Sequence, residues 1–147
     1  MNTIKLLFLL MMGIFGNAYA QTENEIIGAW ESDKKDVIIE IYRSGDSYQG
    51  KYIWGKQIVE SDGKTSKKDV KNPDKNLRTR NIVGITSLTS LRWNGKEYTD
   101  GKIYNAPSGD TYSCKVWIKN NKLYLRGYLG LSLLGQTASF HRTLNSK

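Results

Sequence analysis

The chain contains one cysteine and one histidine, and both scarcities restrict its chemistry. Cys114 has no partner within the chain, so it cannot form an internal disulfide and the fold must be stable without one. Zinc is bound mainly by cysteine and histidine, so a single residue of each type, Cys114 and His141, argues against a zinc site. We therefore expect no metal and no cofactor.

Long apolar runs are also missing, because no stretch reaches the ~18–20 residues that a membrane-spanning helix requires. The apolar run at residues 6–15 follows Lys5 and precedes the small residues of Ala18-Tyr19-Ala20. A basic residue, a short apolar run and a small-x-small site are typical of a secretory signal peptide. We expect cleavage after Ala20, a mature domain at 21–147 and a periplasmic or secreted protein that is not integral to a membrane. An uncleaved membrane anchor is the alternative.

Helical periodicity is nearly absent from the mature sequence, in which short alternating runs are separated by turn residues. At 111–119, for example, Tyr112, Cys114, Val116 and Ile118 share one face of the predicted strand. Spacing of about 8–12 residues between runs is typical of an all-β sandwich or barrel. Consecutive hairpins favour a single antiparallel up-and-down barrel of about eight strands. The predicted strands are 26–30, 36–43, 48–54, 82–91, 98–104, 111–119, 123–129 and 136–143.

The alternation stops at residues 60–80, which are polar and basic in a chain of net charge +8. From Lys64 to Arg80 there are seven basic and two acidic residues, a net charge of 7 − 2 = +5. This predicted loop is either simply solvated or a binding surface for anionic lipid or polysaccharide. Export argues against nucleic acid as the partner. The candidate anion-binding residues are Lys67, Lys68, Lys71, Arg78 and Arg80.

A leucine-rich segment punctuated by glycines precedes the last predicted strand. Because glycine weakens an ordinary strand, Gly127, Gly130 and Gly135 indicate a tight corner at a barrel end. The exposed leucines either plug that end of the barrel or form a contact surface. They are Leu129, Leu131, Leu133 and Leu134.

Gly28-x-Trp30 in the first strand and Arg142 in the last resemble the lipocalin arrangement, in which the indole closes the barrel floor beneath an arginine. A guanidinium over an indole face contributes ~0.5–2 kcal/mol, and it would join the first strand to the last. The resemblance therefore implies that Trp30 and Arg142 close the barrel.

Four further motifs resemble the bacterial secreted family catalogued as domain of unknown function number 2147. This resemblance implies a lipocalin-like, calycin-type barrel outside the cytoplasm, and it brings no catalytic residues. Asn105-Ala106, Gln136 and Phe140 depart from the Asp-Pro, Arg and Trp that are common in the family. The motifs are Asn72-Pro73-Asp74, Gly101-Lys102-Ile103-Tyr104, Gly109-x-x-Tyr112-Ser113-Cys114, and Leu125-x-Gly127 through Gly135 to Arg142, and the single residue Gly84 also matches.

Catalysis finds little support in the sequence. Cys114 lies on an apolar strand face, where a free cysteine usually acts as a small buried hydrophobe rather than as a nucleophile paired with His141. No close pair of carboxylates falls on a predicted inner face, and a hydrolase with unrecognised carboxylates remains the third alternative.

Aromatic residues on the predicted inner faces would suit either the wall of a ligand cavity or a packed core. We predict a protein that binds a small hydrophobic or amphipathic ligand. The alternative is a non-catalytic cell-envelope protein that binds anionic lipid or polysaccharide through the basic loop. The predicted ligand-binding residues are Tyr52, Trp54, Tyr104 and Tyr112.

Overall fold

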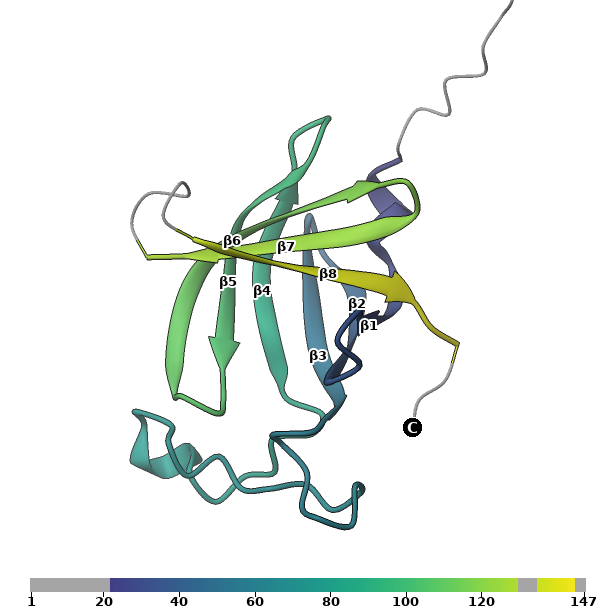
Figure 1. Cartoon of the computed structure of the whole chain (residues 1–147). Helices are drawn as coiled ribbons and strands as arrows, with labels where there is room; N and C mark the ends of the chain where they lie inside the picture. Colours follow the sequence, from purple (N-terminus) through teal and green to yellow (C-terminus); the bar gives the residue numbers. More distant parts are fainter. Residues whose placement is uncertain (1–21, 130–134, 145–147) are drawn as a thin grey trace, which may run out of the picture.

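Eight antiparallel strands follow one another around a closed barrel in the computed structural model, which describes residues 22–129 and 135–144 (Figure 1). Each strand pairs with the next along the chain, and the last pairs with the first. The prediction of an all-β, up-and-down barrel is confirmed. The strands are β1 (Gly28–Ser32), β2 (Val37–Ser44), β3 (Ser47–Gly55), β4 (Thr86–Trp93), β5 (Tyr98–Asn105), β6 (Asp110–Lys119), β7 (Lys122–Tyr128) and β8 (Gln136–Arg142).

A short 3-10 helix, η1 (Glu23–Ile26), lies at one end of the barrel and is held there by buried side chains. The Trp30 indole donates to the carbonyl of Ile26 at 2.8 Å, and the Tyr98 hydroxyl donates to the carbonyl of Glu23 at 2.7 Å. The Tyr48 hydroxyl donates to the side chain of Asn24 at 2.9 Å. These bonds satisfy polar atoms beside the core and close this end of the barrel.

The core fills the half of the barrel next to η1 and continues to its middle. Each completely buried apolar side chain there contributes ~1.5–3 kcal/mol to the free energy of folding, because it removes apolar surface from water. Cys114 is one of them, and burial raises the pKa of its thiol to about 12. His141 lies on the outer side of the barrel wall, beside Asp33. Cys114 and His141 therefore do not form a catalytic dyad. The fully buried core includes Trp30, Tyr48, Leu88, Leu91, Tyr98, Val116 and Leu123.

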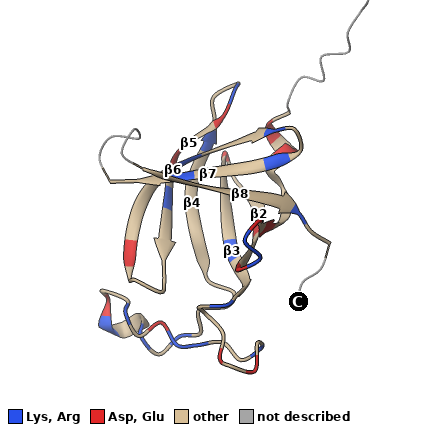
Figure 2. Cartoon of the chain, in the orientation of Figure 1, with Lys and Arg blue, Asp and Glu red and all other residues tan. Residues whose placement is uncertain are grey.

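The β3–β4 segment, residues 56–85, runs beneath the other end of the barrel (Figure 1). It contains the 3-10 helix η2 (Lys75–Leu77), capped by the Asp74 side chain. Ile58, Val59 and Ile82 are buried, so this segment packs as part of the folded domain. Figure 2 shows basic positions along it, with acidic positions between them.

The sequence predicted a strand from Ile82 onward, and this was wrong for its first four residues, because β4 begins at Thr86. Gly84 has a φ of +93°, a left-handed conformation that an extended strand does not allow. The backbone of Gly84 donates to the carbonyl of Tyr52, and Ile82 donates to Lys67, outside the regular ladder. Within the described ranges, no helix has the length and apolar character needed to cross a membrane.

Candidate functional site

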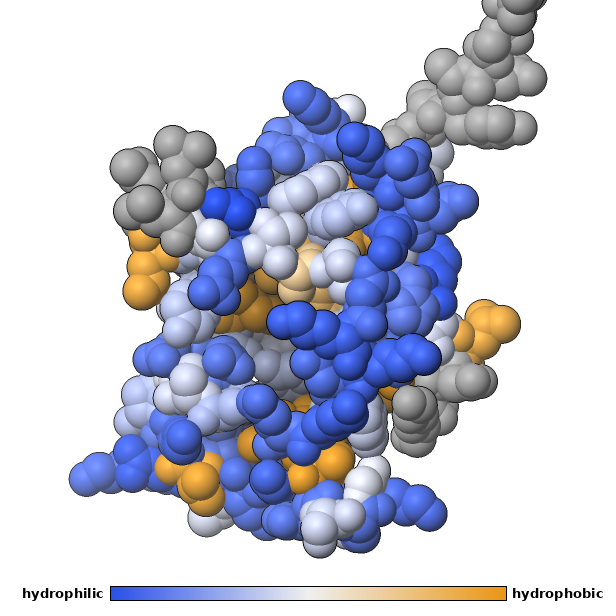
Figure 3. All heavy atoms as spheres, viewed as in Figure 1, coloured by the Kyte–Doolittle hydropathy of each residue, from blue (hydrophilic) through white to orange (hydrophobic). Residues whose placement is uncertain are grey.

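The described residues leave the half of the lumen away from η1 incompletely filled. Ala138 faces inward, because it pairs with Leu125, which packs against the core, and yet it is exposed. Ile103 and Tyr112 form another inward pair and are only half-buried. Around and below β8, hydrophobic atoms lie recessed between hydrophilic ones (Figure 3). Among the described residues, none covers the inner wall of β5 to β8 at this end.

Small residues create this space. A side chain on Gly127 would approach no atom closer than 3.8 Å, the distance to Cβ of Tyr112. Ala138 contributes only a methyl group from the next strand, and Gln136 pairs with Gly127 at the rim. By contrast, Gly101 in the middle of the barrel is tightly enclosed, since an added Cβ would lie 2.7 Å from the sulfur of Cys114. The packed core therefore ends between the level of Gly101, where a side chain has no room, and the level of Gly127, where it has room.

Two tyrosines connect the barrel wall to the β3–β4 segment. The hydroxyl of Tyr52 donates to the carbonyl of Tyr104 at 2.9 Å, and burial raises the pKa of Tyr52 to about 12. The hydroxyl of Tyr104 in turn donates to Asp69 at 2.6 Å. Burial and this hydrogen bond raise the pKa of Tyr104 to about 12, because both disfavour the phenolate. Both phenols therefore remain neutral donors at physiological pH.

Asp69 is the anchor of the β3–β4 segment. Its side chain is fully buried and forms an ion pair with Arg80 at 2.9 Å. The Asn72 amide donates to the same carboxylate at 2.8 Å, so the buried charge has three partners when Tyr104 is included. A buried carboxylate is tolerated only with such compensation. The segment is thus bound to the end of β5 by a complete polar network.

The turn between β5 and β6 approaches this network closely. A side chain at Gly109 would overlap the carbonyl of Lys71, and Gly109 has a φ of +79°, so glycine is required on both grounds. Ala106 in the same turn is buried. The turn and the β3–β4 segment therefore form one packed rim on one side of the open lumen.

The four predicted ligand-binding residues do not all face the lumen. Tyr52 and Tyr112 face the lumen, as expected. Tyr104 belongs to the opposite face from its neighbour Ile103 and points to Asp69. Only the first two thus have side chains in the lumen.

The expectation that Trp54 faces inward was wrong. Tyr52 pairs with Ile39 and Trp54 with Ile38, so β3 carries one extra residue between them. This β-bulge reverses the alternation and turns Trp54 to the outer face, where its indole donates to the carbonyl of Gly63 at 2.9 Å. Simple period-two counting cannot reveal a bulge, because the extra residue has no distinctive side chain.

The candidate anion-binding residues do not form one solvent-facing cluster. Arg80 pairs with Asp69, and Nε of Arg78 donates to the carbonyl of Asn72 at 2.7 Å. Lys68 donates to the side chain of Asn81. Across the part of the chain that the structure describes, Lys67 and Lys71 have no ion-pair partner. Much of the positive charge of the β3–β4 segment therefore stabilises the segment itself.

At the leucine-rich segment, Leu129 is 70% exposed, at the end of β7. Gly130, Leu131, Leu133 and Leu134 lie outside the described residues. Gly135 leaves no room for a side chain, because an added Cβ would overlap the carbonyl of Gly127. The sequence predicted a tight corner at Gly127, Gly130 and Gly135. Of the two that the structure describes, Gly135 lies in such a close approach and Gly127 does not.

At the closed end, the Arg142 guanidinium lies 4.3 Å from the centre of the Trp30 ring. It also donates to the carbonyls of Ile27 and Glu25. Trp30 and Arg142 are paired across β1 and β8, so this contact lies at the seam of the barrel.

Sequence reasoning missed several residues of the site. From the sequence, Asp69 contributes only a negative charge to a basic loop. Its closeness to the Asn72-Pro73-Asp74 turn is the one feature of the sequence that could have indicated a structural role. Ile103, Leu125 and Ala138 were missed because alternation identifies the inner face of a strand but not which of its positions remain uncovered.

Comparisons with known proteins agree with this fold. Residues 28–142 match the model of a family described as an uncharacterized protein conserved in bacteria, DUF2147. A solved structure described as protein HP1028 from the human pathogen Helicobacter pylori, which belongs to the lipocalin family, superposes with a TM-score of 0.71. Its sequence is 26% identical, over 82% of this chain and 84% of that one. No match was found among curated proteins. The chain is therefore a lipocalin-like barrel and belongs to the DUF2147 family.

Proposed function

We propose that this protein binds a small hydrophobic or amphipathic molecule in the open half of its barrel. The observation that carries the proposal is the exposure of inward-facing apolar residues, above all Ala138, which is exposed and pairs with the half-buried Leu125, while the inward-facing Ile103 is also only half-buried. A barrel that fills its lumen with its own side chains leaves no such residues uncovered. Exposed apolar surface rimmed by polar residues is typical of a ligand-binding site.

The polar groups at the rim suit an amphipathic ligand. Tyr112 faces the lumen with its hydroxyl 3.4 Å from Asp110, and Gln136 faces inward at the outermost position of β8. Both can form hydrogen bonds with a polar head while the ligand's apolar part contacts Ile103 and Leu125. The similarity to a member of the lipocalin family is consistent with this kind of binding.

Location outside the cytoplasm is part of the proposal. It is supported by the signal-peptide pattern, Lys5 followed by the apolar run 6–15 and Ala18-Tyr19-Ala20. Expression of the full chain in a bacterium, followed by N-terminal sequencing of the periplasmic or secreted protein, tests it. Gln21 as the first residue is the expected result, and an intact N-terminus in the cytoplasm would contradict it.

The lumen is tested by Ala138→Trp, with Thr137→Trp as the matched control. Position 138 faces the lumen, whereas Thr137 pairs with Arg126 on the outer wall and is exposed. We expect wild type and Thr137→Trp to bind 11-(dansylamino)undecanoic acid saturably at one site, measured by dansyl fluorescence. Ala138→Trp should weaken binding by at least about tenfold, because the indole occupies the ligand volume. Equal binding by the two variants, or no saturable binding to wild type, would refute the lumen site.

Binding to an anionic surface through the β3–β4 segment has less support. Arg78 is engaged with a backbone carbonyl of the segment, and the charge of Arg80 is balanced by the buried Asp69. The lumen remains the site that the geometry favours.

A further inference from the structure

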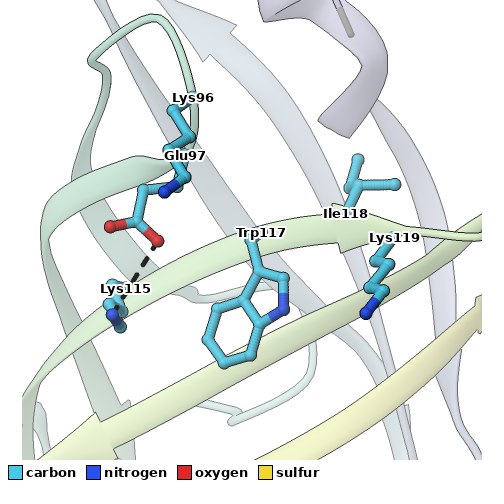
Figure 4. Close-up of a pocket in the computed structure, with 6 residues that line it drawn as sticks. All are labelled: Lys96, Glu97, Lys115, Trp117, Ile118 and Lys119. Carbon is cyan, nitrogen blue, oxygen red and sulfur yellow. Dashed lines mark ion pairs between the residues drawn. The ribbon is translucent and has the colours of Figure 1, made fainter.

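A second hollow lies on the outer wall of the barrel, beside the tip of the β4–β5 hairpin (Figure 4). Its volume is about 290 Å³. Trp117 lines it and faces away from the lumen, because it pairs with Tyr124 while the neighbouring Val116 pairs with the inward-facing Leu125. The lining residues are Lys96, Glu97, Lys115, Trp117, Ile118 and Lys119.

The indole of Trp117 forms a rigid platform. Tyr124 stacks on it with ring centres 5.5 Å apart and planes 10° from parallel. Tyr124 does not line the hollow, so the pair presents the Trp117 side to it. The ammonium of Lys115 lies 5.6 Å from the centre of the indole, as the negative potential of an aromatic face favours. The same potential attracts the partly positive C–H groups of a sugar ring.

The charges around this platform are arranged for an anionic ligand that also carries hydroxyls. Three ammonium groups and one carboxylate line the hollow, a net charge of 3 − 1 = +2. The Glu97 carboxylate forms an ion pair with Lys115, at 3.8 Å, and within the described ranges Lys96 and Lys119 form no ion pair. The two lysines can therefore bind an acidic group, and the Glu97 carboxylate can accept hydrogen bonds from hydroxyls.

We propose that this hollow binds an acidic sugar unit of a polysaccharide. The sugar ring lies on Trp117, a hydroxyl donates to Glu97, and the sugar's carboxylate pairs with Lys96 or Lys119. Single-stranded nucleic acid also combines rings with negative charge, but the Glu97 carboxylate that lines the hollow is an acceptor, and it suits the several hydroxyls of a sugar ring better than a phosphodiester, which has none. The site is separate from the lumen and does not depend on the lumen being a binding site.

The experiment is an NMR titration of the full mature chain, following the indole N–H signal that Trp117→Thr removes. The probe is trigalacturonic acid, and its methyl ester is the uncharged control with the same rings. We expect saturable shifts of the Trp117 signal with the acid and binding at least about fivefold weaker with the ester, because the ester lacks the charge that the lysines recognise. Equal binding of acid and ester, or tighter binding of an oligothymidylate of matched charge, would overturn the proposal.

Variants locate the binding. Trp117→Thr introduces a β-branched residue, which suits a strand, at a half-buried outer position of β6, and we expect it to weaken binding of the acid about tenfold, as judged by the remaining backbone signals. Lys119→Gln, which leaves the Trp117 indole intact, should weaken binding of the acid severalfold.

Lys67→Gln is the control, because it removes the same charge from the β3–β4 segment, and it should leave binding of the acid unchanged. Equal loss with Lys67→Gln and Lys119→Gln would show general electrostatic attraction instead of this site. Ala138→Trp should bind the acid normally, which separates this test from that of the lumen.

Discussion

Arg142 lies over Trp30, with 4.3 Å between the guanidinium carbon and the ring centre, and so joins the last strand of the barrel to the first. The ladder between β1 and β8 is short, with three residue pairs against eight between β2 and β3. Outside the barrel, Asp33 reinforces the seam by pairing with Lys122 at 2.5 Å and with His141 at 3.0 Å. Side chains on both faces of the wall therefore supplement the few backbone bonds that close the barrel.

Arg142→Leu should lower the free energy of unfolding by about 1–3 kcal/mol, because it removes the contact with Trp30 and two hydrogen bonds to backbone carbonyls. Urea denaturation followed by circular dichroism measures the change. Arg92→Leu is the control, because Arg92 pairs with Asp46 on the open surface and should cost less than about 1 kcal/mol. Equal costs for the two arginines would mean that Arg142 is an ordinary surface residue.

Gly101→Ala and Gly127→Ala should affect the stability of the protein differently, although both glycines face the lumen. A Cβ at Gly101 would lie 2.6 Å from a methyl of Leu91 and 2.7 Å from the sulfur of Cys114, so we expect a loss of about 1–3 kcal/mol. At Gly127 the nearest atoms are 3.8 Å and 3.9 Å away, and alanine should be neutral or stabilising by up to about 1 kcal/mol. Thermal unfolding of both variants provides the measurement. A destabilised Gly127→Ala would mean that this end of the lumen is packed.

Asp69→Asn should loosen the β3–β4 segment. The change removes the charge that holds Arg80 and weakens the bond from Tyr104. The segment contains many lysines and arginines, so limited digestion with trypsin should cleave it at least about fivefold faster than in wild type, because cleavage follows local opening. Asp62→Asn, in an exposed turn of the same segment, should have a smaller effect. The role of Asp69 as the anchor fails if both variants are cleaved at the wild-type rate.

How far the sequence predicts the molecule can be judged from individual residues. Tyr112, Cys114, Val116 and Ile118 were assigned to the inner face by alternation alone, and they do face the lumen. The same reasoning failed at Trp54, because the bulge in β3 shifts the register after Tyr52. Local alternation holds only while both strands contribute equal numbers of residues, and the partner strand is not visible in a local pattern.

The sequence by itself determined the class of fold. Period-two hydrophobicity and turn residues at short intervals were enough for an up-and-down barrel, because these signals depend on local backbone geometry and side-chain polarity. The lipocalin-like character was implied by the resemblance of Gly28-x-Trp30 and Arg142 to that family. Only the tertiary structure decided that Asp69 is a buried anchor and that the inward-facing Ala138 is exposed. Burial of a charge and the filling of a lumen depend on residues far apart in the chain, which meet only when the barrel closes.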